Sequence, residues 1–164
     1  MTATRARAVR VPGVALVLAG AVLVIVSFEF LDWYDVPSQG ADSVGDATFG
    51  HLRSLADQLD GAGSADAYFG WLGWALLIVL IVAGVTANLP FGPADPFRVA
   101  GFLAGLSGVA ITYLAVAQLH NAQVAAGATK HSVFYNSTWG LWAALTGFAV
   151  GAIGAALGPR SVSR

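Results

Sequence analysis

The chain has 164 residues and a formal net charge of -1, and it is 57% hydrophobic but only 10% charged. Because soluble domains are about 25% charged, this composition excludes an ordinary soluble protein, and we expect no nucleic-acid partner. Cysteine is absent, which excludes disulfides, thiolate nucleophiles and cysteine metal sites.

The first predicted element is a membrane helix over residues 12–31. Three arginines occupy the first ten positions, and an apolar run follows from Val11 to Phe28, interrupted only by Ser27. The run is longer than the apolar region of a signal peptide, which has about 7–15 residues, and no small-x-small cleavage site follows it. We therefore expect an uncleaved helix, whose ~20 residues are enough to cross a hydrocarbon core of about 30 Å.

Residues 32–67 are predicted to form a polar loop that contains a short amphipathic helix. The loop holds seven aspartates. Its apolar residues recur at helical spacing, which favours a helix lying on the membrane surface or over the bundle. They are Phe49, Leu52, Leu55, Ala56 and Leu59. Asp46 is the expected N-cap and Gly61 the expected end, and Arg53 lies four residues before Asp57, as in a helical ion pair.

Three further membrane helices are predicted downstream, over residues 68–89, 98–121 and 136–157. The first of them begins with the interface anchors Trp71 and Trp74 and stops at Pro90. A second polar loop, 122–135, precedes the last helix. The predicted fold class is therefore all-α. We expect a single domain over residues 1–164, a four-transmembrane-helix bundle with a short extracytoplasmic amphipathic helix in the first outer loop.

The distribution of basic residues predicts the orientation. Six of the eight Lys and Arg residues lie in the N-terminal segment, the turn at 90–98 and the C-terminal tail, whereas Arg53 and Lys130 lie in the two longer loops. The positive-inside rule then places both termini in the cytoplasm and both loops outside. We expect a multi-pass protein of the inner (plasma) membrane.

Small residues recur along the third and fourth predicted helices at intervals of three and four, so that each helix carries one narrow stripe. Such stripes let membrane helices pack closely. The packing residues are Gly101, Gly105 and Gly108 on the third helix and Gly147, Gly151 and Gly154 on the fourth. We expect the two stripes to meet, since a short loop joins the helices. The alternative is that one stripe binds a partner protein or a second copy.

Glu29 is the first candidate functional residue, because an ionisable group near the edge of the hydrocarbon commonly serves a function. Asp32 is expected one helical turn further along the same face. Two acidic groups at this level suggest a proton-linked or cation-binding role. The simpler alternative is a boundary carboxylate that reaches water or is held by the bundle.

More polar side chains are expected at the same level, and together with Glu29 and Asp32 they form a candidate functional cluster. They are Gln118, His120, Asn121 and His131. Histidine with carboxylate suits a divalent metal or a pH switch, but these residues lack the spacing of a ligand set. We therefore expect interfacial hydrogen bonding, with no metal, no cofactor and no catalytic residue. The aromatic residues near this level are expected to form an interfacial belt.

One motif points to an enzyme. Gly105-Leu106-Ser107-Gly108 resembles the GxSG element of rhomboid proteases, which carry a serine nucleophile inside a membrane helix. That resemblance implies a histidine base on a later membrane helix, and a serine needs such a base within hydrogen-bond reach. The predicted fourth helix has no histidine, so we do not expect proteolysis.

The overall plan is a basic N-terminus, a first helix ending in Phe-Leu-Asp-Trp-Tyr, an acidic first loop and three more helices. This layout resembles the small four-helix membrane proteins of high-GC actinobacteria. The resemblance implies either no assigned activity or a role as accessory subunit in envelope lipid transport or another membrane assembly. The layout is also similar to that of claudins, in architecture only, because claudins carry a cysteine pair in the first loop.

We therefore expect a non-enzymatic accessory or structural subunit of a larger membrane complex, such as one that transports envelope lipids. Its expected surroundings are the lipid bilayer and either a larger membrane protein or a second copy of the chain. The first alternative is a small oligomeric transporter or ion conductor that uses Glu29 and Asp32. The second is a membrane enzyme that uses the cluster of acids and histidines.

Overall fold

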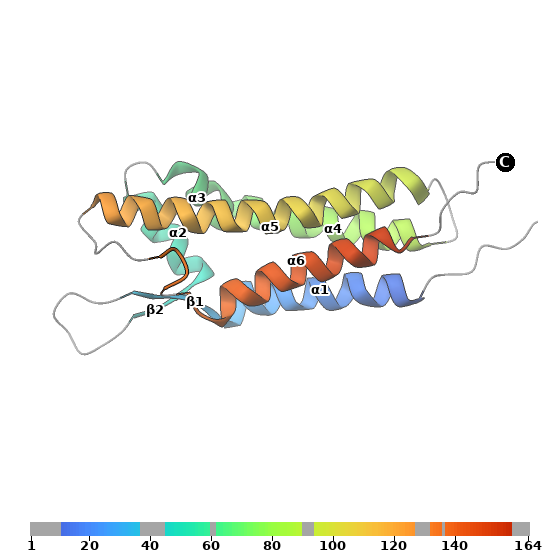
Figure 1. The fold of residues 1–164 in the computed structure, drawn as a ribbon, viewed down its shortest axis with the longest axis horizontal. Helices are drawn as coiled ribbons and strands as arrows, with labels where there is room; N and C mark the ends of the chain where they lie inside the picture. The colour runs from blue at the N-terminus through green and yellow to red at the C-terminus, as the bar shows by residue number, and fades with distance from the viewer. Residues whose placement is uncertain are drawn as a thin grey trace, which may run out of the picture.

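The computed structural model describes residues 11–36, 45–59, 62–89, 94–126, 132–135 and 137–158. Its elements, in chain order, are α1 (Val11–Phe30), β1 (Asp32–Val36), β2 (Gly45–Thr48), α2 (Phe49–Gln58), α3 (Gly63–Ala67), the π-helical turn η1 (Tyr68–Leu72), α4 (Gly73–Asn88), α5 (Ala94–Ala125) and α6 (Trp139–Ala156). Figure 1 shows the long helices running side by side, with β1, β2 and α2 gathered at one end.

Four helices in the described residues are long and apolar enough to cross a membrane. They are Val11–Phe30, Gly63–Asn88, Asp95–Ala125 and Trp139–Ala156. Their outward faces carry large apolar side chains that only an apolar solvent would stabilise, such as Val22, Ile78, Leu114 and Ile153. The predicted helical bundle with four membrane-length helices is therefore confirmed.

Two of the helices extend beyond their predicted bounds. The helix predicted over 98–121 runs from Ala94 to Ala125, because Pro96 lies in the first turn, where the backbone N–H groups have no intrahelical partner in any case. The helix predicted over 68–89 begins at Gly63 and passes through the π-helical turn η1 before α4. The last helix begins later than predicted, at Trp139, because Ser137 and Thr138 pair with β1 instead.

A small antiparallel ribbon was not predicted. β1 pairs with β2, with Tyr34 opposite Ala47 and Val36 opposite Gly45. Asp32 therefore opens a strand after α1 has ended at Phe30, and the expectation that it continues the helical face of Glu29 is wrong.

The helix α2 lies where the periodicity predicts one, and it buries Phe49, Leu52 and Ala56. Its predicted cap is wrong. Asp46 belongs to β2, and the N-cap position is Thr48, which makes no side-chain capping bond. The ion pair of Arg53 also differs from the expected one, since its Nε lies 4.0 Å from Asp66 Oδ1 rather than pairing along α2. The predicted end at Gly61 lies outside the described residues.

The closest helix packing joins α1 to α6. A Cβ on Gly147 would lie 2.6 Å from the main-chain oxygen of Gly20, and one on Gly154 would lie 2.7 Å from the main-chain nitrogen of Val17. Backbones approach this closely only where both helices present small residues. Gly147 and Gly154 of α6 therefore allow the backbone of α1 to pack closely against α6.

The small residues of α5 pack mainly against α6, and Gly101 meets Cβ of Ala155 on α6 as well as α4. A Cβ on Gly105 would lie 2.6 Å from Cβ of Ala152, and one on Gly101 would lie 2.9 Å from the nitrogen of Gly84 on α4. Gly108 accommodates the ring of Phe148. The stripe of α5 thus meets α6, as expected, but it meets Phe148, Ala152 and Ala155 rather than Gly147 and Gly154, which face α1. A Cβ on Gly151 would lie 2.6 Å from Cδ2 of Leu80 on α4.

Candidate functional site

The strand β1 inserts a fully buried tryptophan into the end of the bundle. Trp33 is 0% exposed, and its Nε1 donates a 2.9 Å hydrogen bond to the main-chain oxygen of Ser27. That oxygen lies in the last turn of α1, where carbonyl groups have no intrahelical partner. The indole N–H therefore satisfies a free carbonyl group at the C-terminal end of α1. This bond also fixes the direction of the chain after the helix.

Aromatic rings from the three elements α1, α2 and η1 surround this tryptophan. Its ring centroid lies 5.8 Å from that of Phe28, 5.3 Å from Phe49 and 5.7 Å from Phe69. Phe28 and Phe49 stack at 4.0 Å. Edge-to-face and stacked pairs of this kind add about 0.5–1.5 kcal/mol each beyond simple burial. We refer to β1, β2, α2 and α3 together as the cap, and this cluster attaches the cap to the bundle.

Tyr34 connects the cap to the end of α5. Its hydroxyl donates to the main-chain oxygen of Val133 at 3.1 Å and lies 3.3 Å from Nδ1 of His120. A phenol has one proton, so the Val133 bond leaves its oxygen as the acceptor toward His120. His120 then carries its proton on Nδ1. Burial raises the pKa of the Tyr34 phenol above its usual value, which keeps it a donor over the physiological range.

Two further side-chain bonds involve the same region. Ser64 Oγ of α3 donates to Oε1 of Gln118 on α5, and the hydroxyl of Thr138 donates to the main-chain oxygen of Asp32. The residues Gln118 and His120 thus both serve to hold the cap to α5, one through α3 and the other through β1. This arrangement leaves them engaged in structural hydrogen bonds.

The other members of the predicted cluster do not join this network. Glu29 and Asn121 are exposed, and Asp32 is half-buried at the start of β1. His131 lies outside the described residues. Within the described part of the chain, no three His, Asp or Glu side chains are placed to share a metal ion. Of the predicted cluster, Gln118 and His120 each bond to the cap through a different partner, and the carboxylates of Glu29 and Asp32 take no part in either bond.

Two tyrosines that were not expected to be functional residues organise this end of the molecule. Besides Tyr34, the hydroxyl of the buried Tyr68 lies 2.5 Å from Oγ1 of Thr112, which in turn donates to the main-chain oxygen of Gly108 at 2.6 Å. Thr112 stands in the small-residue stripe of α5, and a hydroxyl in such a stripe was the available signal for a bond between helices.

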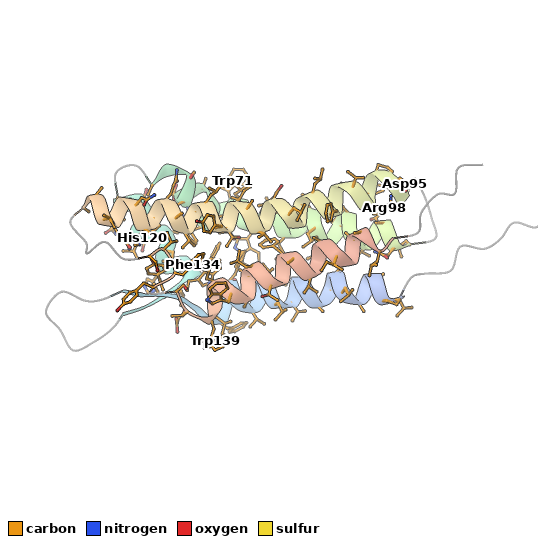
Figure 2. All side chains as sticks on the ribbon, in the orientation of Figure 1. Trp71, Asp95, Arg98, His120, Phe134 and Trp139 are labelled. Carbon is orange, nitrogen blue, oxygen red and sulfur yellow. The ribbon has the colours of Figure 1, made fainter. Side chains whose placement is uncertain are left out.

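An exposed row of aromatic rings lies beside the cap. The ring of Phe134 stacks on Trp142 of α6 at 5.3 Å and lies 5.8 Å from Tyr113 of α5. All three side chains are more than a third exposed. Figure 2 shows Phe134 between α5 and α6, at the same level as His120. We call Tyr113, Phe134 and Trp142 the aromatic row.

No protein-family model, curated protein or solved structure matches this chain. The four long apolar helices of the described residues are those of a multi-pass membrane protein.

Proposed function

We propose that the chain is a non-enzymatic membrane subunit that binds a larger membrane protein laterally, through the aromatic row. The observation that supports this proposal is the exposed, stacked arrangement of the three rings in the aromatic row. Tryptophan and tyrosine are enriched among residues that dominate binding energy, and these rings are held in place by stacking before any partner arrives. Preorganised side chains lose little conformational entropy on binding.

The buried polar groups support this proposal because they serve the fold. Ser27, Thr112 and Asn88 are buried, and each hydrogen-bonds to a main-chain oxygen of a helix. Within the described residues, the long helices bury no acidic or histidine side chain. The surface, rather than the interior, is therefore where this molecule offers specific contacts.

The proposal includes an orientation. The excess of Lys and Arg in the terminal segments and in the 90–98 turn supports cytoplasmic termini under the positive-inside rule. The cap, with α2, would then lie on the extracytoplasmic side of the plasma membrane. In Figure 1, α1 begins and α6 ends at the same end of the bundle. This arrangement agrees with an orientation in which the first and last helices both have their outer ends on the cytoplasmic side.

The test is affinity purification from native membranes, with a C-terminal tag and mass spectrometry of the co-purifying proteins. We expect a stoichiometric partner with the wild-type chain and its loss with Trp142→Ala. The matched control is Trp71→Ala, which removes a 63% exposed tryptophan from η1, outside the aromatic row. If both variants retained the partner, or both lost it equally, the aromatic row would not be the binding surface.

One observation favours a second function, an oligomeric ion conductor. Glu29 is exposed on α1, so association of several copies through α1 would bring these carboxylates around a common axis. A carboxylate ring is one way to select cations. The wild-type protein would then conduct cations in liposomes and Glu29→Gln would not, and equal conductance of the two would exclude this function.

A further inference from the structure

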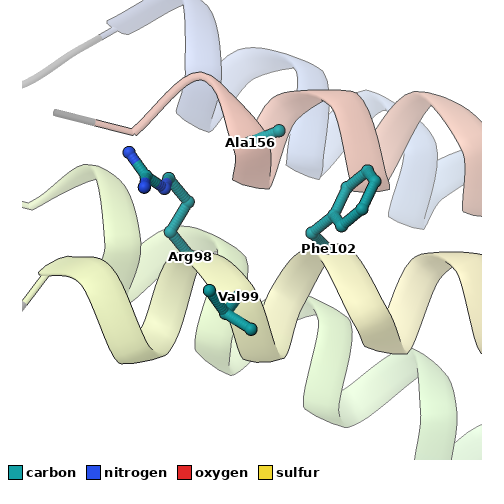
Figure 3. A pocket seen from close by; sticks show the side chains of 4 residues that line it. All are labelled: Arg98, Val99, Phe102 and Ala156. Carbon is teal, nitrogen blue, oxygen red and sulfur yellow. The ribbon is translucent and has the colours of Figure 1, made fainter. Parts of the chain in front are cut away.

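A groove opens at the end of the bundle opposite the cap. It has a volume of about 230 Å³ and is lined by Arg98, Val99, Phe102 and Ala156. Figure 3 shows it between the start of α5 and the end of α6, with the guanidinium of Arg98 at one side and the ring of Phe102 at the other. The groove therefore has one cationic wall and otherwise apolar walls.

Only part of the Arg98 guanidinium is paired with the described residues. Its Nη2 lies 3.4 Å from Oδ1 of Asp95. Its Nη1 is buried and has no hydrogen-bond partner among the described residues, and the side chain is 24% exposed. An unpaired buried donor lowers the stability of the folded state, and more so when it is charged. A ligand that accepts a hydrogen bond from Nη1 would recover this cost.

The position of Arg98 on its helix favours the same interpretation. It lies in the first turns of α5, which begins at Ala94, and a helix N-terminus attracts anions and repels cations. The helix dipole therefore disfavours an arginine at this place, although its pair with Asp95, three residues earlier on α5, offsets part of that cost. An anion in the groove would be attracted both by the guanidinium and by the N-terminal end of α5.

The apolar walls indicate that this anion carries a hydrocarbon chain. Phe102 lies about one turn, or roughly 6 Å, further along α5 than Arg98. Val99 and Phe102 are 51% and 37% exposed, and they stand where the helix enters the apolar span. A headgroup bound at Arg98 would thus direct its acyl chains along these two side chains and into the surrounding lipid.

We propose that this groove binds the phosphate of an anionic phospholipid. Anionic headgroups are known to occupy basic pockets between membrane helices, and an arginine presents its donors in a fork that matches phosphate. The inference depends only on the groove and on the membrane location, so it is independent of the proposed subunit function.

The test is native mass spectrometry of the full chain, released from detergent with added phosphatidylglycerol or phosphatidylcholine. We expect the wild type to retain phosphatidylglycerol in preference, and Arg98→Gln to bind it at least tenfold more weakly, as follows from the loss of charge-assisted hydrogen bonds. Arg53→Gln is the matched control, since it removes an arginine at the cap end whose side chain is 63% exposed. It should bind like the wild type.

Two further measurements keep the result independent of folding defects. Asp95→Asn removes the negative charge beside the guanidinium, so it should raise the affinity for phosphatidylglycerol, and a gain cannot arise from misfolding. Inorganic phosphate at millimolar concentration should not displace the lipid. Equal binding by Arg98→Gln and wild type, weaker binding by Asp95→Asn, or full displacement by inorganic phosphate would each overturn the proposal.

Discussion

The hydroxyl of Ser27 donates a 2.6 Å hydrogen bond to the main-chain oxygen of Gly140, across 113 residues of sequence. This bond joins the end of α1 to the start of α6 and continues the glycine contacts between these two helices. Small residues stand at every seventh position on both helices, and they are Gly13, Gly20 and Ser27 on α1 and Gly140, Gly147 and Gly154 on α6. The antiparallel α1–α6 pair is therefore a continuous close-packed seam.

Gly20→Ala should destabilise the bundle strongly. The added Cβ would lie 2.6 Å from the main-chain nitrogen of Gly151 and also against the main-chain oxygen of Gly147. Backbone cannot yield as a flexible side chain can, so α1 and α6 must separate, at a cost of about 1–3 kcal/mol or more. The measurement is the free energy of unfolding in mixed micelles, followed by circular dichroism.

The control for this prediction is Gly50→Ala on α2, where an added Cβ meets nothing within 4 Å. Alanine is a better helix former than glycine by up to about 1 kcal/mol, so this variant should be no less stable than the wild type. Equal losses of stability in the two variants would show that the seam is not a close-packed one.

Replacing Trp33 should loosen the cap in two distinguishable steps. Trp33→Phe keeps a ring in the cluster but leaves the main-chain oxygen of Ser27 without the indole donor, at a cost of about 1–3 kcal/mol. Trp33→Ala also removes the ring contacts and should cost about 3–5 kcal/mol. Amide hydrogen exchange should rise in β1 and β2 in that order. An unchanged exchange rate in Trp33→Ala would mean that the cap is held by other contacts.

Alkaline pH should weaken the attachment of Tyr34. Burial raises the pKa of this phenol in the folded protein, whereas an unfolded tyrosine titrates near pH 10. The folded state therefore binds the proton more tightly, and the stabilisation is complete below about pH 10 and falls as the pH rises toward the raised pKa. The stability difference between wild type and Tyr34→Phe should shrink between pH 8 and pH 11, as measured by unfolding at each pH. A constant difference would contradict the burial of the phenol.

The membrane helices could be predicted because each is specified by its own residues. An apolar run of about 20 residues must form its hydrogen bonds internally in lipid, and α1 illustrates this directly. The ribbon could not be predicted in the same way. Asp32–Val36 opens an aspartate-rich segment, and the burial of Trp33 depends on rings contributed by Phe49 and Phe69, which are distant in sequence.

The partners of the glycines show a second limit of sequence reasoning. A stripe of small residues identifies a helix face that packs closely, but it does not identify the helix that it meets. Adjacency in the chain suggested that α5 and α6 pair through their stripes, whereas Gly147 and Gly154 lie against α1. Similarly, His120 could be selected as a candidate, but its contact with Tyr34 depends on how the ribbon folds back.

Asn88 is fully buried at the end of the α1–α6 seam that lies opposite the cap. Its Nδ2 donates to the main-chain oxygens of Gly84 at 2.8 Å and Gly154 at 3.2 Å. Its Oδ1 has no hydrogen-bond partner among the described residues and occupies the space that a side chain on Gly13 would need. Asn88 in this position therefore requires a glycine at position 13.

A double-mutant cycle tests this requirement. Gly13→Ala should be strongly destabilising in the wild-type background, because the new Cβ coincides with the Asn88 carboxamide. Asn88→Ala should also be destabilising, by about 1–2 kcal/mol from its lost helix-to-helix hydrogen bonds. In Asn88→Ala, however, the space beside Gly13 is vacant, so adding Gly13→Ala should cost little. The coupling energy should lie between about 0.5 and 3 kcal/mol in favour of the double variant, and strict additivity would show that Asn88 does not pack against Gly13.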